Sequence, residues 1–467
     1  MKLSEGRKQH LHNLIQKAKN LRENLEGDID DQLVSSIYRE ATAISSRVVI
    51  ASDKKGATWD VYLDRIVTHP LTGFPLMFLV LAVVFWVTIQ GANYPSQLIA
   101  EFLFGVEDRA VQLFETLGAP WWLTGFIWHG VWRGLAWVVS VMLPPMAIFF
   151  PMFTILEDFG YLPRVAFNMD ALFQKAGAHG KQALTMAMGF GCNAAGVIST
   201  RIIDSPRERL IAILTNNFVP CNGRYPTLIM LASIFIASAF PPGIASLAAA
   251  GAVVGVVVLG IFFTLIVSYG LSRTILKGEA SAFTLELPPY RRPRILQTLY
   301  TSIIDRTIFV LWRAIIMAAP AGAVIWLLGN IQVEGVALST RIADWLDPFG
   351  RLLGLDGVII LAYIIAIPAN EIVVPTIIMG YMQSGMMIEL DSLNELRHLL
   401  IDQQGWTMVT AISLMLFSLL HNPCSTTLLT IWKETGSLKW TVIGALLPLS
   451  IAFVVCFLFA TIAGFFI

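Results

Sequence analysis

Three cysteines lie beside prolines or polar residues inside long apolar runs, which is an unusual setting for a thiol. Cys221 and Cys424 each follow a proline directly, and Cys192 lies in a glycine-rich stretch. Glu371 places a carboxylate, and His421 an imidazole, in similar runs. Thiol, imidazole and carboxylate donors together suit a transition metal better than sodium or potassium. The residue types therefore indicate transition-metal chemistry, although the spacing alone does not name the metal.

The candidate residues fall into metal ligands and residues beside the pathway. The expected metal ligands are Cys192, Cys221, Cys424, Glu371 and Asn193. The residues expected beside the pathway are Asn222, His421, Asn422, Asn370 and Thr427. Each of these residue types also has a structural interpretation. A thiol can pack as a small hydrophobe, as we expect for Cys456. A buried carboxylate can form a hydrogen bond between helices, and a histidine can cap a helix end.

Helix breaks are expected to position these side chains. A proline inside a membrane helix removes a backbone donor, so the breaks at Pro220, Pro368 and Pro423 leave groups that need partners in protein or in a wet cavity. Residues 218–227 and 420–427 form a weak sequence repeat, and each has Pro-Cys in the middle of an apolar run. Paired interrupted segments of this kind indicate a transport site between two structural repeats.

The composition places these breaks in a membrane. The 467 residues are 56% hydrophobic and only 14% charged, and the mean hydropathy is +0.68. A soluble protein has about a quarter charged residues. The formal net charge is zero, which gives no reason to expect a nucleic-acid partner. We therefore predict an all-α, polytopic integral membrane protein with about seven to nine transmembrane helices and two gate repeats that contain broken or re-entrant helices.

Apolar runs and flanking charges predict the topology. Residues 183–200 are predicted to form a re-entrant or broken helix, because basic residues flank both ends. Arg164, Lys175 and the basic loop before residue 308 indicate the cytoplasmic side, and the acidic 387–404 connection the external side. The predicted spans run at about residues 71–90, 135–156, 210–240, 245–271, 308–328, 357–382, 406–432 and 440–467, and the breaks at Pro220, Pro368 and Pro423 fall inside three of them.

The same patterns predict five regions and a cytoplasmic N-terminus. The regions are 1–60, a cytosolic amphipathic segment; 61–130, the first transmembrane helix and an external segment; 131–271, the first gate repeat and the following span; 272–307, a cytosolic basic loop; and 308–467, the second gate repeat and the C-terminal span. Within the first region, residues 11–25 and 33–48 show helical apolar spacing, so they dock on a partner or membrane, or form a solvated helix pair.

Enzymatic chemistry is not expected from this chain. The stretch 177–182 has glycines and a lysine like a phosphate-binding loop, but it lacks the correctly spaced first glycine and the Ser or Thr after the lysine. Glu157 and Asp158 form an acidic pair without an accompanying nucleophile or metal motif. We therefore expect a transporter without a nucleotide site and without a permanently bound cofactor.

From about residue 60 onward the chain resembles the FeoB family, ferrous iron transport protein B. The resemblance is carried by residues 63–73 and 156–164, by 189–193 with Thr200 and Arg201, and by the stretches 423–427 and 433–437. It implies uptake of Fe(II) as substrate across the inner membrane. It also implies that Cys192, Cys221 and Cys424 line the pathway and that Glu371 lies near it.

The chain also departs from the family pattern. The family commonly has a cytosolic GTPase domain before the first span, and here we expect the transmembrane portion without it, working with a separate FeoB-type GTPase and a small FeoA-type SH3-like protein, and as a possible homo-oligomer. Asn370 replaces a lysine that usually precedes the glutamate. Two other functions stay open: a gate-type transporter of nucleosides or other solutes, and a non-transporting membrane scaffold.

Overall fold

The computed structural model describes residues 16–17, 29–48, 59–278, 290–291, 294–388, 390 and 392–465. Contacts divide the chain into two units, one of residues 1–62 with 280–286 and one of residues 63–279 with 287–467. In the first unit, α2 (Ile29–Val48) confirms the second amphipathic helix. Its apolar side chains Ile37, Ile44 and Val48 are exposed. The first predicted amphipathic helix, 11–25, lies outside the described residues except for Gln16 and Lys17.

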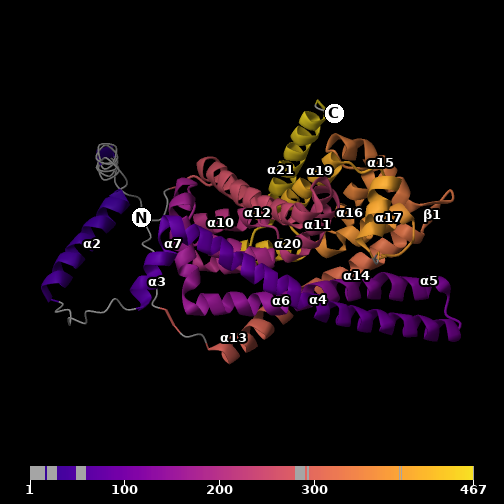
Figure 1. The fold of residues 1–467 in the computed structure, drawn as a ribbon, viewed down its shortest axis with the longest axis horizontal. Helices are drawn as coiled ribbons and strands as arrows, with labels where there is room; N and C mark the ends of the chain where they lie inside the picture. Colours follow the sequence, from indigo (N-terminus) through magenta and orange to yellow (C-terminus); the bar gives the residue numbers. More distant parts are fainter. Residues whose placement is uncertain are drawn as a thin grey trace, which may run out of the picture. The chain divides into compact units, whose positions relative to one another are not determined.

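The second unit is built almost entirely from helices (Figure 1). Its first half contains α3 (Trp59–Val67), which begins in the first unit, α4 (Pro70–Thr116), α5 (Trp121–Thr124), η1 (Gly125–Trp132), α6 (Arg133–Phe159), α7 (Tyr161–Lys175), α8 (Gln182–Gly191), α9 (Asn193–Ser199), η2 (Thr200–Ile202), α10 (Pro206–Thr215), η3 (Asn216–Phe218), η4 (Asn222–Arg224), α11 (Tyr225–Leu231), η5 (Ala232–Ile236), η6 (Ala237–Ala239) and α12 (Pro242–Arg273). Its second half contains α13 (Ile295–Thr301), η7 (Ser302–Ile308), α14 (Phe309–Asn330), the hairpin β1 (Gln332–Val333) and β2 (Val336–Ala337), α15 (Leu338–Leu352), α16 (Gly357–Ile365), η8 (Asn370–Ile372), α17 (Val373–Met382), α18 (Leu393–Arg397), η9 (His398–Gln403), α19 (Met408–Leu420), α20 (Ser425–Thr435) and α21 (Leu438–Gly464).

The described residues contain six segments long and apolar enough to cross a membrane, or seven if the bent pair α15 and α16 forms one span. The all-α polytopic fold is therefore confirmed, at the lower end of the predicted number of spans. The predicted spans 210–240, 357–382 and 406–432 are each broken into shorter helices, and the breaks fall at Pro220, Pro368 and Pro423 as predicted. The predicted break in 183–200 is present, and it falls at Cys192, whose backbone is extended with φ −151°.

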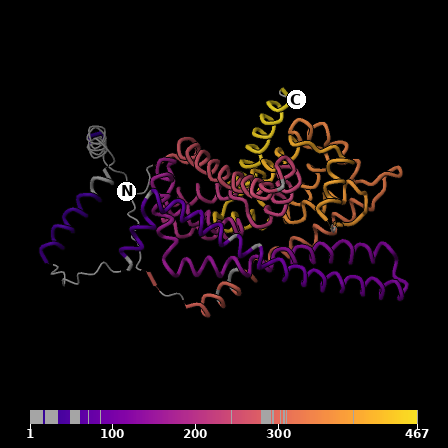
Figure 2. Tube along the Cα trace, viewed as in Figure 1, coloured from indigo at the N-terminus to yellow at the C-terminus, as the bar shows by residue number. Residues whose placement is uncertain are grey.

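The first span is much longer than predicted, because the helix does not end at residue 90. α4 has 47 residues, which rise about 70 Å, more than twice the roughly 30 Å of a hydrocarbon core. Figure 2 shows α4 and α6 side by side over much of their length. Beyond the apolar run, the fully buried Glu107 of α4 bonds to His129 at 2.7 Å and to Arg133 at 2.9 Å. These contacts attach the continuation of α4 to the start of α6.

The two halves of the second unit meet where α6 crosses α14. A Cβ atom added to Gly134 would lie 2.8 Å from the Cα of Gly322, and one added to Gly322 would lie 2.3 Å from the carbonyl oxygen of Gly130. Glycines at a crossing allow two helix backbones to approach closely, which is a common device in membrane proteins. The first and second gate repeats are thus in direct backbone contact.

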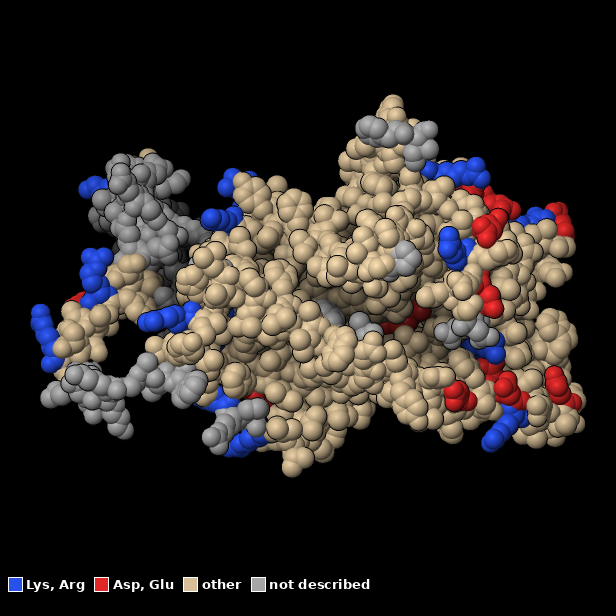
Figure 3. Space-filling view, viewed as in Figure 1, with Lys and Arg blue, Asp and Glu red and all other residues tan. Residues whose placement is uncertain are grey.

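Charged side chains gather at the ends of the second unit. Within it, α5, α15 and β1 lie at one end, and α7, α10 and α13 at the other (Figure 1). On the face drawn in Figure 3, acidic side chains gather over the end that carries α15 and β1, and uncharged side chains cover the middle. The segregation agrees with the predicted acidic and basic ends of the spans. Glu389 and Asp391 of the predicted acidic connection lie outside the described residues.

Candidate functional site

Four helix breaks meet in the second unit, two from each gate repeat. The first repeat is broken at Cys192, between α8 and α9, and at residues 219–221, between η3 and η4. The second repeat is broken at residues 366–369, between α16 and η8, and at residues 421–424, between α19 and α20. The predicted ligands lie in these breaks or in the turn that follows them. The breaks are therefore the elements that position the site.

Hydrogen bonds connect each break to another. The main-chain N–H of Ser425 donates to the carbonyl oxygen of Ile367 at 2.8 Å. The amide of Asn217 donates to the carbonyl oxygen of His421 at 2.6 Å, and the amide of Asn216 donates to that of Asn193 at 3.0 Å. Because broken helices leave backbone groups without intrahelical partners, such bonds are what makes the breaks tolerable at membrane depth.

Arg224 is the centre of this network. Its guanidinium is 1% exposed and donates to the carbonyl oxygens of Asn217 at 2.9 Å, Leu419 at 2.7 Å and His421 at 3.2 Å. The last two are at the C-terminal end of α19, where a helix carries partial negative charge. A buried cation is costly without partners, so these bonds both compensate Arg224 and terminate α19. The first repeat thereby supplies the cap of a helix in the second.

The three predicted cysteines converge at the breaks. Cys192 and Cys221 are buried, and Cys424 is half-buried with its Sγ 3.3 Å from the hydroxyl of Thr427. Glu371 follows the remaining break, and hydrogen bonds link the four breaks to one another. Sequence positions spread over more than 230 residues thus lie in one region of the structure.

Glu371 is held against a glycine of the other repeat. A Cβ atom added to Gly223 would lie 2.3 Å from Oε1 of Glu371 and 2.6 Å from its Cδ. Glu371 itself is half-buried, in η8 directly after the third break. The carboxylate therefore fits only because position 223 lacks a side chain.

His421 is fixed by backbone carbonyls. Its Nδ1 lies 2.9 Å from the carbonyl oxygen of Ser418 and 3.1 Å from that of Phe417, and both of these oxygens can only accept. Nδ1 therefore carries the proton, and Nε2, 3.3 Å from Oδ1 of Asn370, keeps the lone pair in the neutral ring. Since a lone pair needs a donor, the Asn370 amide is best oriented with its nitrogen toward the histidine. His421 is the C-terminal cap residue of α19, which agrees with the structural interpretation of this histidine.

The other predicted residues divide between the network and the half-buried surface. The Asn193 amide lies 3.3 Å from the amide of Asn217, and in its alternative orientation its nitrogen reaches the carbonyl oxygens of Gly189 and Val219. The Asn193 side chain therefore connects the break at Cys192 with the break at residues 219–221. Asn222 and Asn422 are half-buried beside Cys221 and Cys424. Thr427 is buried one helical turn after Cys424.

The donors do not form a closed coordination site. Within the described part of the chain, no three His, Cys, Asp or Glu side chains are close enough together to hold one metal ion. The site consists instead of neighbouring thiol, carboxylate and amide donors along the breaks. A divalent ion of intermediate softness could exchange water for such donors a few at a time.

An ion pair links the repeats a short distance beyond the breaks. Arg201, in η2 after α9, donates to Glu434 near the end of α20 through Nε at 2.8 Å and a terminal nitrogen at 2.7 Å. Arg201 is 67% exposed, whereas Glu434 is 11% exposed. The pair lies where α9 of the first repeat and α20 of the second repeat end, so it joins the two repeats there.

Sequence reasoning missed Arg224, Asn216 and Asn217 as residues that organise the site. Arg224 could have been found, because an arginine within an apolar run is expensive in a membrane and is expected to have a function. Its partners could not, since Leu419 and His421 are almost 200 residues away and contribute only backbone oxygens.

Two family models match the chain. The model described as nucleoside recognition (Gate) matches residues 139–235 and 311–438, and the model of the ferrous iron transport protein B C terminus matches residues 253–305. The Gate matches cover α6 to η5 and α14 to the start of α21, and so contain all four breaks. Fold and site together define a polytopic helical membrane protein with two gate repeats.

Curated relatives give the family. A protein of Synechocystis sp. named Fe(2+) transporter FeoB is 30% identical over 443 residues, 93% of this chain and 68% of the relative. One of Staphylococcus aureus with the same name is 28% identical over 458 residues, 95% of this chain and 66% of the relative. A Porphyromonas gingivalis relative is named as a fusion of Fe(2+) transport protein A and Fe(2+) transporter FeoB. It is 28% identical over 444 residues, which are 85% of this chain and 50% of the relative.

The chain belongs to the FeoB family. It spans about half to two thirds of the length of these relatives. The relatives are named as transporters, which agrees with a role other than catalysis. No solved structure matches the chain.

Proposed function

We propose that the protein is a permease for ferrous iron, with Fe(II) moving along the four helix breaks. The observation that carries the proposal is that Cys192, Cys221, Cys424 and Glu371, from both gate repeats, lie at helix breaks that hydrogen bonds link to one another. Thiolates and a carboxylate favour a transition metal over alkali ions, and the names of the relatives make Fe(II) the leading candidate.

The arrangement suits passage better than storage. A channel or carrier must bind its ion firmly enough to replace part of the water shell and weakly enough to release it. Neighbouring positions with one or two donors meet both needs, whereas a closed four-ligand site retains the metal. In this proposal Glu371 supplies charge at the half-buried edge, the thiols supply softer donors, and Asn222 and Asn422 supply neutral oxygen donors.

We further propose inner-membrane localisation, with the N-terminus and the basic end of the spans in the cytoplasm. The support is the positive-inside rule applied to the basic end that carries α7, α10 and α13. A separate GTPase and an FeoA-type protein would be the cytosolic partners, and the fused Porphyromonas gingivalis relative supports the second of these. No catalytic step is assigned to this chain.

Anaerobic uptake of radiolabelled Fe(II) into proteoliposomes tests the proposal. Cys221→Ser and Glu371→Gln should each reduce uptake roughly 10- to 100-fold, because a charged donor contributes about 1.5–3 kcal/mol. Cys456→Ser is the matched control, since Cys456 is buried against Ser413 away from the breaks. Uptake should be saturable and should resist competition by uridine.

Two results would overturn the proposal. Equal uptake by wild type and both variants would remove the thiol and carboxylate from the pathway. Uridine uptake without iron uptake would favour a solute transporter.

A further inference from the structure

A large apolar groove opens between α4, α12 and the segment formed by α11 and η5. Its volume is about 760 Å³, within the range of small-molecule sites. Aliphatic and aromatic side chains line it, with the hydroxyl groups of Tyr225, Ser233 and Ser246 as exceptions. None of the candidate metal ligands contributes to it. The groove is therefore distinct from the candidate metal site.

The walls of the groove belong to helices that face hydrocarbon. α4 and α12 are both candidate membrane spans, and only 19% and 22% of their most apolar windows are buried by the rest of the protein. Groove residues such as Leu79, Trp86 and Val254 are more than half exposed. The groove is thus continuous with the surface that the bilayer covers. Water has few partners there and would not fill it.

The length of the groove corresponds to one leaflet. Its lining runs along α4 from Pro75 to Trp86 and along α12 from Ser246 to Val258. At 1.5 Å per residue these stretches rise about 16–18 Å, close to half of the roughly 30 Å hydrocarbon core. A single acyl chain extends over the same depth.

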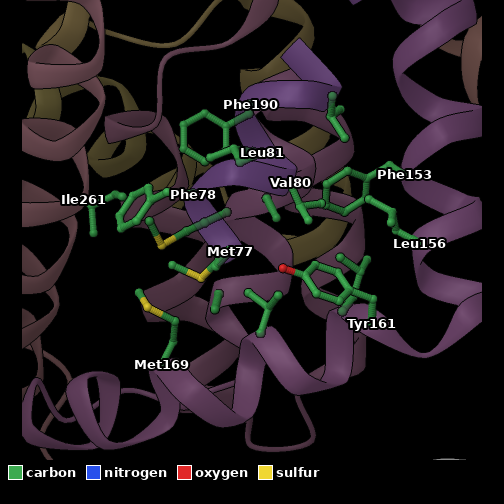
Figure 4. Close-up of a pocket in the computed structure, with 16 residues that line it drawn as sticks. Met77, Phe78, Val80, Leu81, Phe153, Leu156, Tyr161, Met169, Phe190 and Ile261 are labelled. Atoms are coloured by element: carbon green, nitrogen blue, oxygen red, sulfur yellow. The ribbon is translucent and has the colours of Figure 1, made fainter. Parts of the chain in front are cut away.

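We propose that one acyl chain of a bilayer phospholipid occupies this groove. An empty void of this size would forfeit the dispersion contacts of its whole lining, and a methylene chain restores them without requiring hydrogen bonds. A neighbouring cavity, which shares Phe78 and Leu81 with the groove and is also lined by Met77, Tyr161 and Met169 (Figure 4), is only about 70 Å³ and is too small for the same role.

The bound chain would touch the gate. Tyr225 forms part of the groove wall and directly follows Arg224, which caps α19. Ile229 and Ala232 continue the wall along α11 and η5. An acyl chain in the groove therefore supports the helix that holds the buried arginine in place.

Photolabelling with a phospholipid that carries a diazirine in its acyl chain tests the proposal on the full chain in nanodiscs. Labels mapped by mass spectrometry should be enriched at least fivefold on groove residues of α11 and α12 relative to Val454, a lipid-exposed residue of α21. Ala250→Phe, which fills the groove, should abolish the enrichment. Gly251→Phe is the matched control, because its Cβ meets nothing within 4 Å and position 251 does not line the groove.

Two outcomes would overturn the proposal. Equal labelling of groove and Val454, or enrichment that survives Ala250→Phe, would mean that the groove holds no specific chain. Labelling of Val454 without labelling of the groove would mean that protein covers it instead. Labelling does not depend on iron uptake, so this test and that of the permease can fail separately.

Discussion

The guanidinium of Arg224 donates a 2.7 Å hydrogen bond to the main-chain carbonyl oxygen of Leu419, although 195 positions separate the two residues. This bond and its neighbours make the end of a helix in one repeat depend on a side chain in the other. The site is therefore a property of the joined repeats, and substitutions at the junction should act on both.

Arg224→Met should destabilise the protein and abolish uptake. Each carbonyl oxygen left buried without a donor costs about 1–3 kcal/mol, and Arg224 donates to those of Asn217 and Leu419, whereas that of His421 keeps its bond from Asn217. Thermal unfolding in detergent should show a lower midpoint. Arg224→Lys keeps the charge but lacks the planar fork, so it should restore part of the stability. Equal midpoints for wild type and Arg224→Met would refute the capping role.

Gly223→Ala should impair uptake through Glu371. The added Cβ would lie 2.3 Å from Oε1, so the carboxylate must move by about 1 Å to reach an ordinary contact distance. Uptake of Fe(II) in proteoliposomes measures the effect. In a Glu371→Gln background the same change should add little, because the two substitutions act on one group. Gly251→Ala, in open space on α12, should be neutral.

Cd(II) should inhibit Fe(II) uptake by binding the converging thiols. Cadmium is softer than iron and prefers thiolate ligands. Inhibition should weaken at least tenfold in Cys192→Ser and in Cys424→Ser, whereas Cys456→Ser should respond as wild type does. Identical inhibition constants in all four proteins would show that the thiols do not share a metal.

Reversing one charge of the Arg201–Glu434 pair should increase iron leak when no partner is added. The pair joins the ends of α9 and α20, so its loss should make it easier for these two helices to move apart at that end. Exposed pairs contribute about 0–1 kcal/mol, which limits the change to about fivefold. The double variant Arg201→Glu with Glu434→Arg should return the leak to the wild-type level. A leak that stays high in the swap would exclude pairing as the cause.

The apolar runs predicted the unbroken spans closely, because a helix surrounded by lipid needs little more than length and hydropathy. The predicted 245–271, 308–328 and 440–467 correspond to α12, α14 and α21. The prolines also marked the breaks inside 210–240, 357–382 and 406–432. The runs did not indicate which distant segments satisfy the backbone groups freed there, because those partners depend on the tertiary packing.

The candidate site was predictable in its residue types but not in its geometry. Proline and cysteine side by side marked Cys221 and Cys424, and the structure places both at breaks that hydrogen bonds link to the break at Cys192. The assignment of these residues as metal ligands remains a prediction. Nothing in the sequence indicated that Gly223 makes room for Glu371, because that contact depends on the register of two turns in different repeats.

The dependence of Arg224 on Leu419 has a consequence for biosynthesis. At about 5–20 residues per second, a ribosome needs about 10–40 s to synthesise the 195 residues that separate them. During this interval the first repeat has left the ribosome with an arginine in an apolar segment that can donate to Asn217 but lacks its acceptors in α19. The nascent first repeat must therefore wait in an unfinished state, held by the insertion machinery or at the edge of the bilayer, until α19 arrives.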